Sequence, residues 1–220
     1  MASYFSKGFL LRIVLTIPAV LISFSVHEYA HAYTADRLGD KTPRFQGRLT
    51  LNPFVHIDII GFLLFLFIGF GWARPIETNP SSYKHYYSDD LKVSIAGPLS
   101  NFLTSIVFTF ILLIFNKSVY SFYSSSIIVN IIENIIVYTI QMNVILFIFN
   151  LIPLPGLDGF HVVKDIFPRF FYENADKIYR YQYIILFIFI IPFWGGNSIA
   201  SYIVGTPAAS LTKLLLMISL

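Results

Sequence analysis

Residues 9–31, FLLRIVLTIPAVLISFSVHEYAH, join a long apolar run to the motif His-Glu-x-x-His at its end. On a helix, His27 and His31 are four residues apart and therefore lie one above the other on the same face. Two imidazoles placed in this way can occupy two corners of a tetrahedral zinc site, and the adjacent Glu28 is the usual general base for the water of such a metal. An apolar helix that ends in this motif indicates hydrolysis inside a lipid bilayer.

The composition predicts a protein that crosses the bilayer several times. Of the 220 residues, 56% are hydrophobic and only 12% are charged, whereas soluble domains carry about 25% charged residues. The chain has no cysteine, so any metal must be held by His, Asp or Glu. The net charge of +3 gives no reason to expect a nucleic-acid partner. No small-residue cleavage site follows the first apolar run, so we expect this run to stay in the mature protein.

A third metal ligand is expected from the segment NLIPLPGLDG at residues 150–159. Its two prolines break the preceding apolar helix and open the backbone. Asp158 is then the best third ligand, although a carboxylate here can also act as the N-cap of the next helix. Asn150 lies about two turns before it and can hydrogen-bond a substrate carbonyl or a developing oxyanion.

Six apolar segments set the expected topology. A crossing needs about 20 helical residues, and four segments reach or approach that length, at 5–31, 91–116, 127–152 and 198–220. A fifth, at 181–194, reaches it only if Tyr181 and Trp194 serve as interfacial ends. The sixth, at 57–70, is too short, and a full crossing there would prevent His27 and Asp158 from sharing one depth. We expect it to form a re-entrant or hairpin insertion. The prediction is an all-α polytopic membrane protein with about five transmembrane helices. It forms one domain over 1–220, with a core at about 5–165 and closing helices at 181–220.

Basic residues set the expected orientation. They cluster after the two segments that carry the metal ligands, at Arg37, Lys41, Arg44 and Arg48 and again at Lys164, Arg169, Lys177 and Arg180. The positive-inside rule therefore puts the amino terminus outside and the metal near the cytoplasmic face. Five crossings place the carboxyl terminus inside. The polar stretch 42–53 predicts a hairpin or extended loop, which either presents an edge to a substrate or is an ordinary surface loop.

The motif set resembles the site-2 protease family of intramembrane zinc metalloproteases. The resemblance is carried by His27-Glu28-Tyr29-Ala30-His31, Asn150-Leu151-Ile152-Pro153, Leu157-Asp158-Gly159 and Ala96-Gly97-Pro98-Leu99-Ser100-Asn101. The loop from Gly39 to Asp58 is similar to the compact bacterial branch, which lacks PDZ and CBS domains. The resemblance implies a three-helix catalytic core with one zinc ion on His27, His31 and Asp158, and Glu28 as the base. It also implies cleavage of a single-span membrane protein or a signal-peptide remnant in the bacterial cytoplasmic membrane.

Other polar residues are candidates for supporting roles. His56, Asn101 and His161 are possible partners of the ligands, and His56 is also a possible gating residue or alternative ligand. Three rival functions remain open at this stage. The first is a membrane ion or metal transporter, and the second is a non-catalytic metal-binding scaffold. The third is a prenyl-protein type of protease whose third ligand would be Glu133 or Glu173, neither of which lies in a matching motif.

Overall fold

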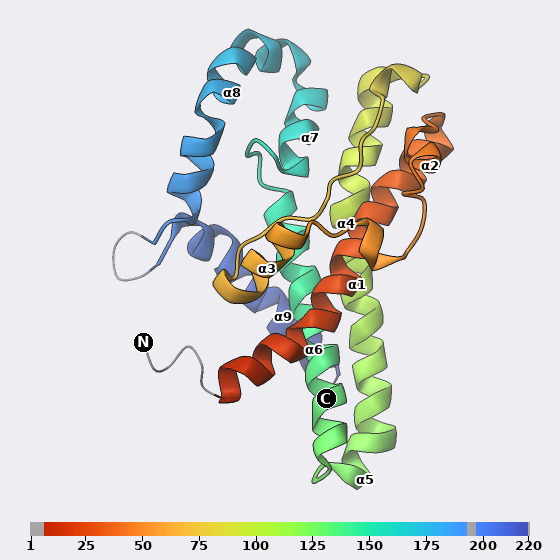
Figure 1. Cartoon of the computed structure of the whole chain (residues 1–220), viewed down its shortest axis with the longest axis vertical. Coiled ribbons are helices and arrows are strands. Elements are labelled where there is room, and N and C mark those ends of the chain that lie inside the picture. The colour runs from red at the N-terminus through yellow and green to blue at the C-terminus, as the bar shows by residue number, and fades with distance from the viewer. Residues whose placement is uncertain (1–6, 193–196, 220) are drawn as a thin grey trace.

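The computed structural model describes residues 7–192 and 197–219, and most of this part of the chain is helical (Figure 1). The longer helices are α1 (Lys7–Leu38), α4 (Tyr86–Phe115), α6 (Ile127–Asn150), α8 (Pro168–Ile190) and α9 (Thr206–Ile218). The shorter ones are α2 (Thr42–Phe45), α3 (Ile59–Ile68), α5 (Ser121–Tyr123) and α7 (Asp158–Ile166), with 3-10 turns at Pro53–Val55 and Pro80–Ser82 and π-helical turns at Asn116–Tyr120 and Ser201–Gly205. Within the described ranges, β-pairing is limited to one antiparallel bridge between Ile57 and Ala73. The all-α prediction is confirmed.

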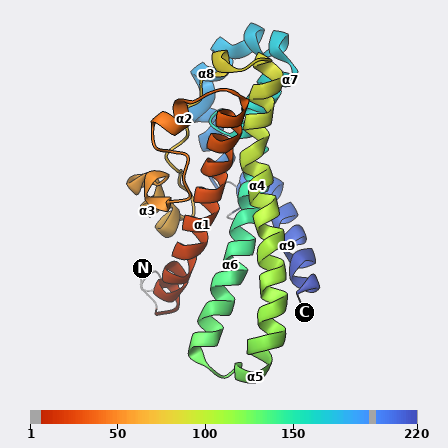
Figure 2. The same cartoon turned by 90° about the vertical axis from the view of Figure 1, so that its right-hand side faces the viewer.

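Helices α1, α4 and α6 pack against one another as a three-helix bundle (Figures 1 and 2). Polar side chains meet at their common interface, where Ser23, Asn101 and Asn143 are fully buried. The Asn101 Nδ2 atom donates to the main-chain oxygen of Ser23 at 3.0 Å and to Oδ1 of Asn143 at 2.8 Å. Hydrogen bonds between polar side chains on neighbouring helices stabilise bundles in lipid, where water cannot satisfy these groups.

Helix α9 packs on the bundle through an apolar cluster with α4 and α6. The buried members of this cluster are Leu112, Ile136, Ile140, Val144, Ala208 and Leu215. Beyond the cluster, Asn116 Nδ2 donates to the main-chain oxygen of Ser219 at 3.1 Å. The end of α9 therefore lies beside the end of α4, as Figure 2 also shows.

Within residues 7–192 and 197–219, four helical stretches are long and apolar enough to cross a membrane. They are Gly8–Leu38, Tyr86–Tyr120, Ile127–Asn150 and Ser201–Ile218. The segment 181–194, expected as a fifth crossing, forms the second half of α8 up to Ile190, and its end at 193–194 lies outside the described residues. Charged side chains fill the first half of α8, so the helix as a whole lacks the composition of a span. The insertion at 57–70 contains the ten-residue α3, which at about 15 Å is too short to cross.

The position of α9 corrects the expectation for the carboxyl-terminal end. Five crossings would leave that end on the side of the metal ligands, whereas α9 runs away from them and ends beside Asn116. Helices α1 and α4 are antiparallel, since Ser23 contacts Asn101 whereas His31, two turns later in α1, contacts Val93, which is earlier in α4. The first described residues and Ser219 therefore lie on the same side of the bundle.

Of the two predictions for 42–53, a hairpin or an extended loop, the hairpin is not formed. The segment instead begins with the one-turn helix α2, in which Pro43 occupies one of the first two positions. Proline is favoured there because its fixed φ suits a helix start, where no N–H is needed. Asp40 accepts a hydrogen bond from the Thr42 amide at 2.9 Å, and Arg48 donates its amide to the Pro43 oxygen at 2.8 Å. These local bonds close a helix and turn rather than two paired strands.

Candidate metal centre

Helix α1 presents both motif histidines at the buried end of its apolar stretch. His27 and His31 are each less than a tenth exposed. Their Nε2 atoms lie 3.1 Å apart, because a spacing of four residues places them on one face of the helix.

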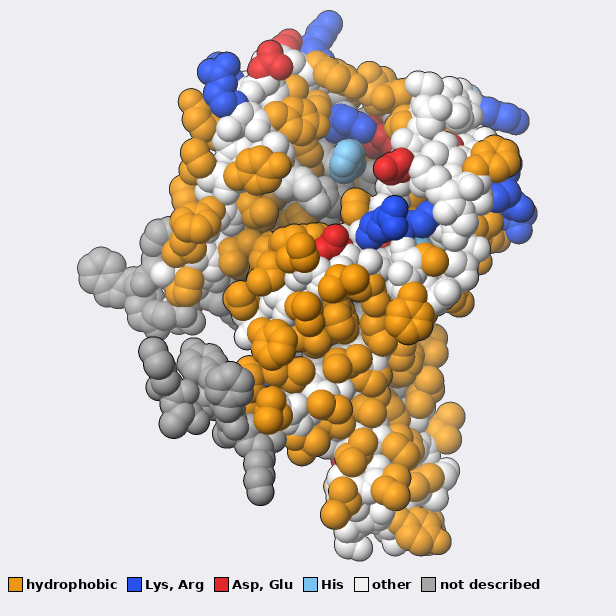
Figure 3. Space-filling model, in the orientation of Figure 1, with side chains coloured by type: hydrophobic (Ala, Val, Ile, Leu, Met, Phe, Trp, Pro, Cys, Tyr) orange, Lys and Arg blue, Asp and Glu red, His pale blue; other side chains and the backbone are white. Residues whose placement is uncertain are grey.

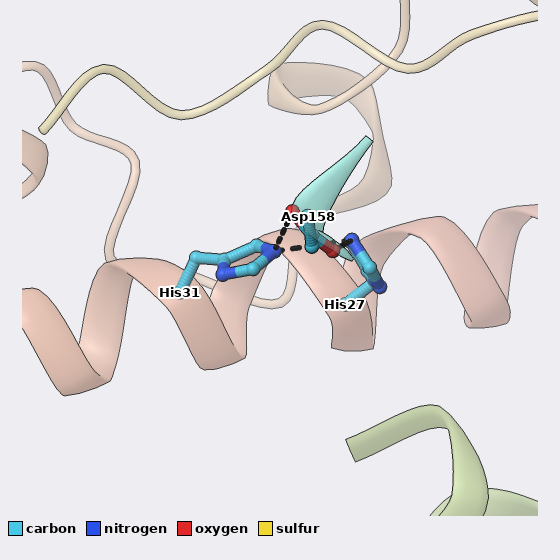
Figure 4. Close-up of side chains that lie close together, drawn as sticks. All are labelled: His27, His31 and Asp158. Carbon is cyan, nitrogen blue, oxygen red and sulfur yellow. Dashed lines mark hydrogen bonds and ion pairs between the residues drawn. The ribbon is translucent and has the colours of Figure 1, made fainter. Parts of the chain in front are cut away.

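Asp158 joins the two histidines from the start of α7 (Figure 4). The chain reaches this position through a break after α6, where Gly156 adopts a left-handed conformation with φ of +91°. Asp158 Oδ2 lies 3.2 Å from His27 Nε2, and Oδ1 lies 3.3 Å from His31 Nε2. Ligand atoms 2.0–2.1 Å from a tetrahedral zinc ion are about 3.3–3.4 Å apart. The three side chains therefore have the spacing of ligands to one metal ion.

Each imidazole makes a hydrogen bond through Nδ1, on the side of the ring away from Asp158. These bonds fix the tautomer of the two histidines. Asn101 uses its Nδ2 to donate to Ser23, so its Oδ1, 2.6 Å from His27 Nδ1, must accept. His31 Nδ1 lies 2.7 Å from the main-chain oxygen of Val93, which can only accept. Both Nδ1 atoms therefore carry the proton. In the neutral rings, both Nε2 lone pairs then face the Asp158 carboxylate.

This arrangement fits a bound cation. Two nitrogen lone pairs and two carboxylate oxygens converge, and Asp158 Oδ2 is buried without a hydrogen-bond donor in the described part of the chain. Either a proton on an imidazole or a metal ion can relieve the repulsion between these groups. Neutral imidazoles held by an acceptor on the opposite nitrogen, together with a carboxylate, form a donor set that zinc prefers.

Gly97 lets α4 approach the ligands closely. A Cβ atom at this position would lie 2.2 Å from His31 Nε2 and 2.7 Å from His27 Cε1. Real Cβ atoms do not come this close, and both rings are already held by α4 through Asn101 and Val93. The motif Ala96–Asn101 therefore supplies both the space for the two rings and one of the groups that orient them.

A cavity of about 480 Å³ opens onto the ligands. Glu28, Asn150 and His161 line it, and its aromatic wall consists of Phe24, Phe65, Phe70, Trp72 and Phe149. Asn150 donates its Nδ2 to the Leu146 oxygen of its own helix at 3.1 Å. Figure 3 shows charged side chains and a histidine around a hollow on this face, above a broad apolar surface.

Glu28 has a contact that sequence reasoning missed. Its Oε2 accepts a hydrogen bond from the main-chain amide of Ile76 at 2.9 Å. His56, predicted near the ligands, is fully buried but is not among the described residues that line the cavity. Its Nε2 donates to the Thr50 oxygen at 2.7 Å, and burial lowers its pKa. Asn101 contacts His27 directly, and His161 lines the cavity.

Two comparisons with known proteins find relatives of this chain. Residues 15–191 match the family model described as Peptidase family M50. The chain is 37% identical over 193 residues to YwhC of Bacillus subtilis (strain 168), covering 86% of this chain and 84% of YwhC. It is 30% identical over 155 residues to Rip2 of Mycolicibacterium smegmatis, covering 69% of this chain and 56% of Rip2. The names of both relatives assign them to the zinc metalloproteases. No solved structure matches the chain.

Proposed function

This chain belongs to peptidase family M50, the site-2 proteases, and we propose that it cuts peptide bonds within membrane-spanning segments of other proteins. It is a zinc metalloprotease of the membrane, and residues 1–220 act in this proposal as one catalytic domain. The observation that carries the proposal is the three-ligand group. It lies at the end of a helix long enough to span a bilayer and faces a cavity with an aromatic wall.

In the proposed site, His27, His31 and Asp158 hold one zinc ion, and each has the right donor atom at the right spacing. Zinc at this position supplies Lewis acidity toward a water molecule and toward the scissile carbonyl. The role of the three side chains is to fix the ion, and Asn101 and the Val93 carbonyl hold the two rings in the required tautomer.

Glu28 is the proposed general base. One of its carboxylate oxygens accepts the Ile76 amide, which leaves the other to take a proton from the attacking water and later to deliver it to the leaving amine. Asn150 lines the same cavity. Its amide is the proposed donor to the oxyanion, through the second N–H of Nδ2, since one N–H is used by the Leu146 carbonyl.

The proposed substrate is the apolar segment of a single-span membrane protein or of a signal-peptide remnant. The aromatic wall of the cavity suits apolar side chains of an unwound peptide. The hydrogen-bonding groups of an unwound backbone need water or protein partners, which a cavity supplies and lipid does not. Because the basic residues cluster beside the ligand-bearing segments, we place the site on the cytoplasmic side of the cell membrane.

The test is cleavage of candidate single-span substrates in reconstituted vesicles. Wild-type protein should cut the substrate, whereas Glu28→Gln, which keeps the size of the side chain but removes its basicity, should retain zinc and lose activity. A chelator should abolish cleavage, and added zinc should restore it. Equal cleavage by both proteins would remove Glu28 from the mechanism. Ion flux without cleavage, abolished by the same substitution, would favour a transporter instead.

A further inference from the structure

The amide that touches Glu28 belongs to an extended segment, residues 73–76, which we call the strap. The strap follows α3 and passes beside α1, 48 residues after Glu28 in the sequence. The contact is specific, because the Ile76 N–H donates to Oε2 of Glu28, a side chain that is only 7% exposed. The strap also forms part of the cavity wall through Ala73, Pro75 and Ile76.

The strap is held in place by pairing with the segment that precedes α3. Ala73 and Ile57 form the antiparallel bridge, and the Arg74 amide donates to the His56 oxygen at 2.8 Å. A Cβ atom at Gly61, in the first turn of α3, would lie 2.2 Å from the oxygen of Trp72, the residue just before the strap. The two arms on either side of α3 are therefore packed closely together, with the strap as the arm that reaches Glu28.

Arg48 joins both arms. It is 5% exposed, and its guanidinium donates to the main-chain oxygens of Val55, on one arm, and Arg74, on the other. It also donates to the Pro75 oxygen at 3.1 Å, one residue before the amide that reaches Glu28. A planar guanidinium can bridge several carbonyls at once, whereas an ammonium group has no fixed fork.

We propose that the strap positions the general base and that Arg48 is the residue that anchors the strap. This inference rests on the proposed role of Glu28. A glutamate side chain has several rotatable bonds, and the Ile76 amide fixes one carboxylate oxygen so that the other faces the reacting water. The chain of contacts runs from the Arg48 guanidinium to the Pro75 carbonyl, to the Ile76 amide and to Glu28. Arg48 and Ile76 are positioning residues and do not touch the substrate in this scheme.

The first test removes the amide. Ile76→Pro deletes the N–H that reaches Glu28, and kcat should fall by about 10- to 100-fold, the scale expected when a reacting group is misplaced by about 1 Å. Zinc content should stay at its wild-type value because the metal ligands are unchanged, and KM should stay near its wild-type value because proline replaces one apolar residue of the cavity wall by another. Glu77→Pro is the matched control, since it places proline one residue later on an exposed position and leaves the Ile76 amide intact.

The second test removes the anchor. Arg48→Met should lower kcat in the same way, with zinc content unchanged, and Arg48→Lys should give an intermediate kcat because lysine keeps the charge but not the fork. Arg74→Met is the matched control, because it removes an exposed cation from the strap while every backbone contact remains. Arg48→Lys is the variant expected to fold even if Arg48→Met does not.

The outcomes separate this inference from the proposed function. If wild-type protein fails to cut any substrate, the proposed function itself is at fault. If wild-type protein cuts and Ile76→Pro and Arg48→Lys both keep its kcat, the positioning role is overturned. A loss of zinc, or a rise in KM without a fall in kcat, would also overturn it, because the strap would then act on the metal or on substrate binding. A lower kcat at constant zinc content and constant KM supports it.

Discussion

The two aspartates of α7 lie in clusters of opposite electrostatic character. Asp158, at the first residue of the helix, faces two imidazole nitrogens. Asp165, in the last turn, is buried beside Lys164, whose Nζ lies 3.5 Å from Asp165 Oδ1 and donates to Asp90 Oδ2 at 2.6 Å. Both clusters join α7 to another helix, and both contain a buried carboxylate oxygen without a hydrogen-bond donor among the described residues.

The difference lies in where the positive charge comes from. Lys164 brings a cation into the Asp90 and Asp165 cluster, so that cluster is partly neutralised by the chain itself. Around Asp158, the two imidazoles already hold their protons on Nδ1, the nitrogens that face away from the carboxylate. When both rings are neutral, this group contains no cation. A buried carboxylate needs a partner charge, and this group can take one from a metal ion. The contrast teaches that the same residue type builds a structural contact or a metal site according to its partners.

The largest effect should come from removing the carboxylate charge at each end of α7. Asp158→Asn leaves the two histidines without the negative ligand, so we expect loss of the bound zinc and of all measurable cleavage. Asp165→Asn is the matched control on the same helix and should keep one zinc per chain. Metal analysis of the two purified proteins gives the answer. Equal zinc contents in the two variants would show that Asp158 and Asp165 do not differ in metal binding.

The next largest effect should come from removing the cation that the chain supplies. Lys164→Met leaves Asp90 and Asp165 buried without a partner charge, which costs about 3–5 kcal/mol of stability. The control is Lys92→Met, whose exposed ammonium pairs with Asp89 at 2.6 Å. Asp89 keeps the His85 amide, so a cost of at most about 1 kcal/mol is expected there. Unfolding in detergent measures both. Equal losses would show that the Lys164 cluster is no more important than a surface pair.

A smaller effect should follow from loosening one ring of the metal group. Asn101→Leu removes the acceptor of His27 Nδ1, and such changes typically weaken metal binding by about 10- to 100-fold. Asn143→Leu is the matched control, because Asn143 contacts Asn101 but not a ligand. Both variants should lose stability, but only the first should lose zinc affinity in a competition titration. A similar loss of affinity in both would mean that the network acts through the fold alone.

The sequence predicts which three side chains come together at the candidate metal centre, and their ligand atoms do lie close to one another. His27 and His31 are related by helical spacing, and Asp158 follows a proline break at a matching depth. It says nothing about the surroundings of Lys164 or Arg48. Both were counted among cytoplasmic loop cations, yet Arg48 is buried against three carbonyls and Lys164 is paired with Asp90. A charge bias counts residues and carries no information on burial.

The topology shows the same limit. Apolar length predicts four of the spans and the short insertion around α3. It does not predict the fold of the last part of the described chain, because residues 181–190 continue α8, whose first half carries charged side chains. The contact between Ile76 and Glu28 also could not be predicted, since it depends on how a loop folds back across 48 residues rather than on side-chain type.

The smallest effect concerns the pH dependence of stability. Burial raises the pKa of Asp165 to about 6, and the carboxylate of Asp90 adds to the shift while Lys164 opposes it. In the unfolded chain, an aspartate titrates near 3.9. Between about pH 4 and pH 6, the folded protein therefore holds a proton that the unfolded chain has released, so the free energy of unfolding falls as pH rises. One proton contributes at most about 1.4 kcal/mol per pH unit.

Asp165→Asn removes this titration, so its stability should fall less than that of the wild type across the same interval. Asp176→Asn on the exposed face of α8 is the control and should keep the wild-type slope. Unfolding curves of the three proteins at several pH values measure the difference. If the slopes of wild type and Asp165→Asn coincide, Lys164 fully neutralises the cluster. The two ends of α7 would then differ more sharply. The carboxylate of Asp165 would already be neutralised by Lys164, whereas the carboxylate of Asp158 would still need an added cation.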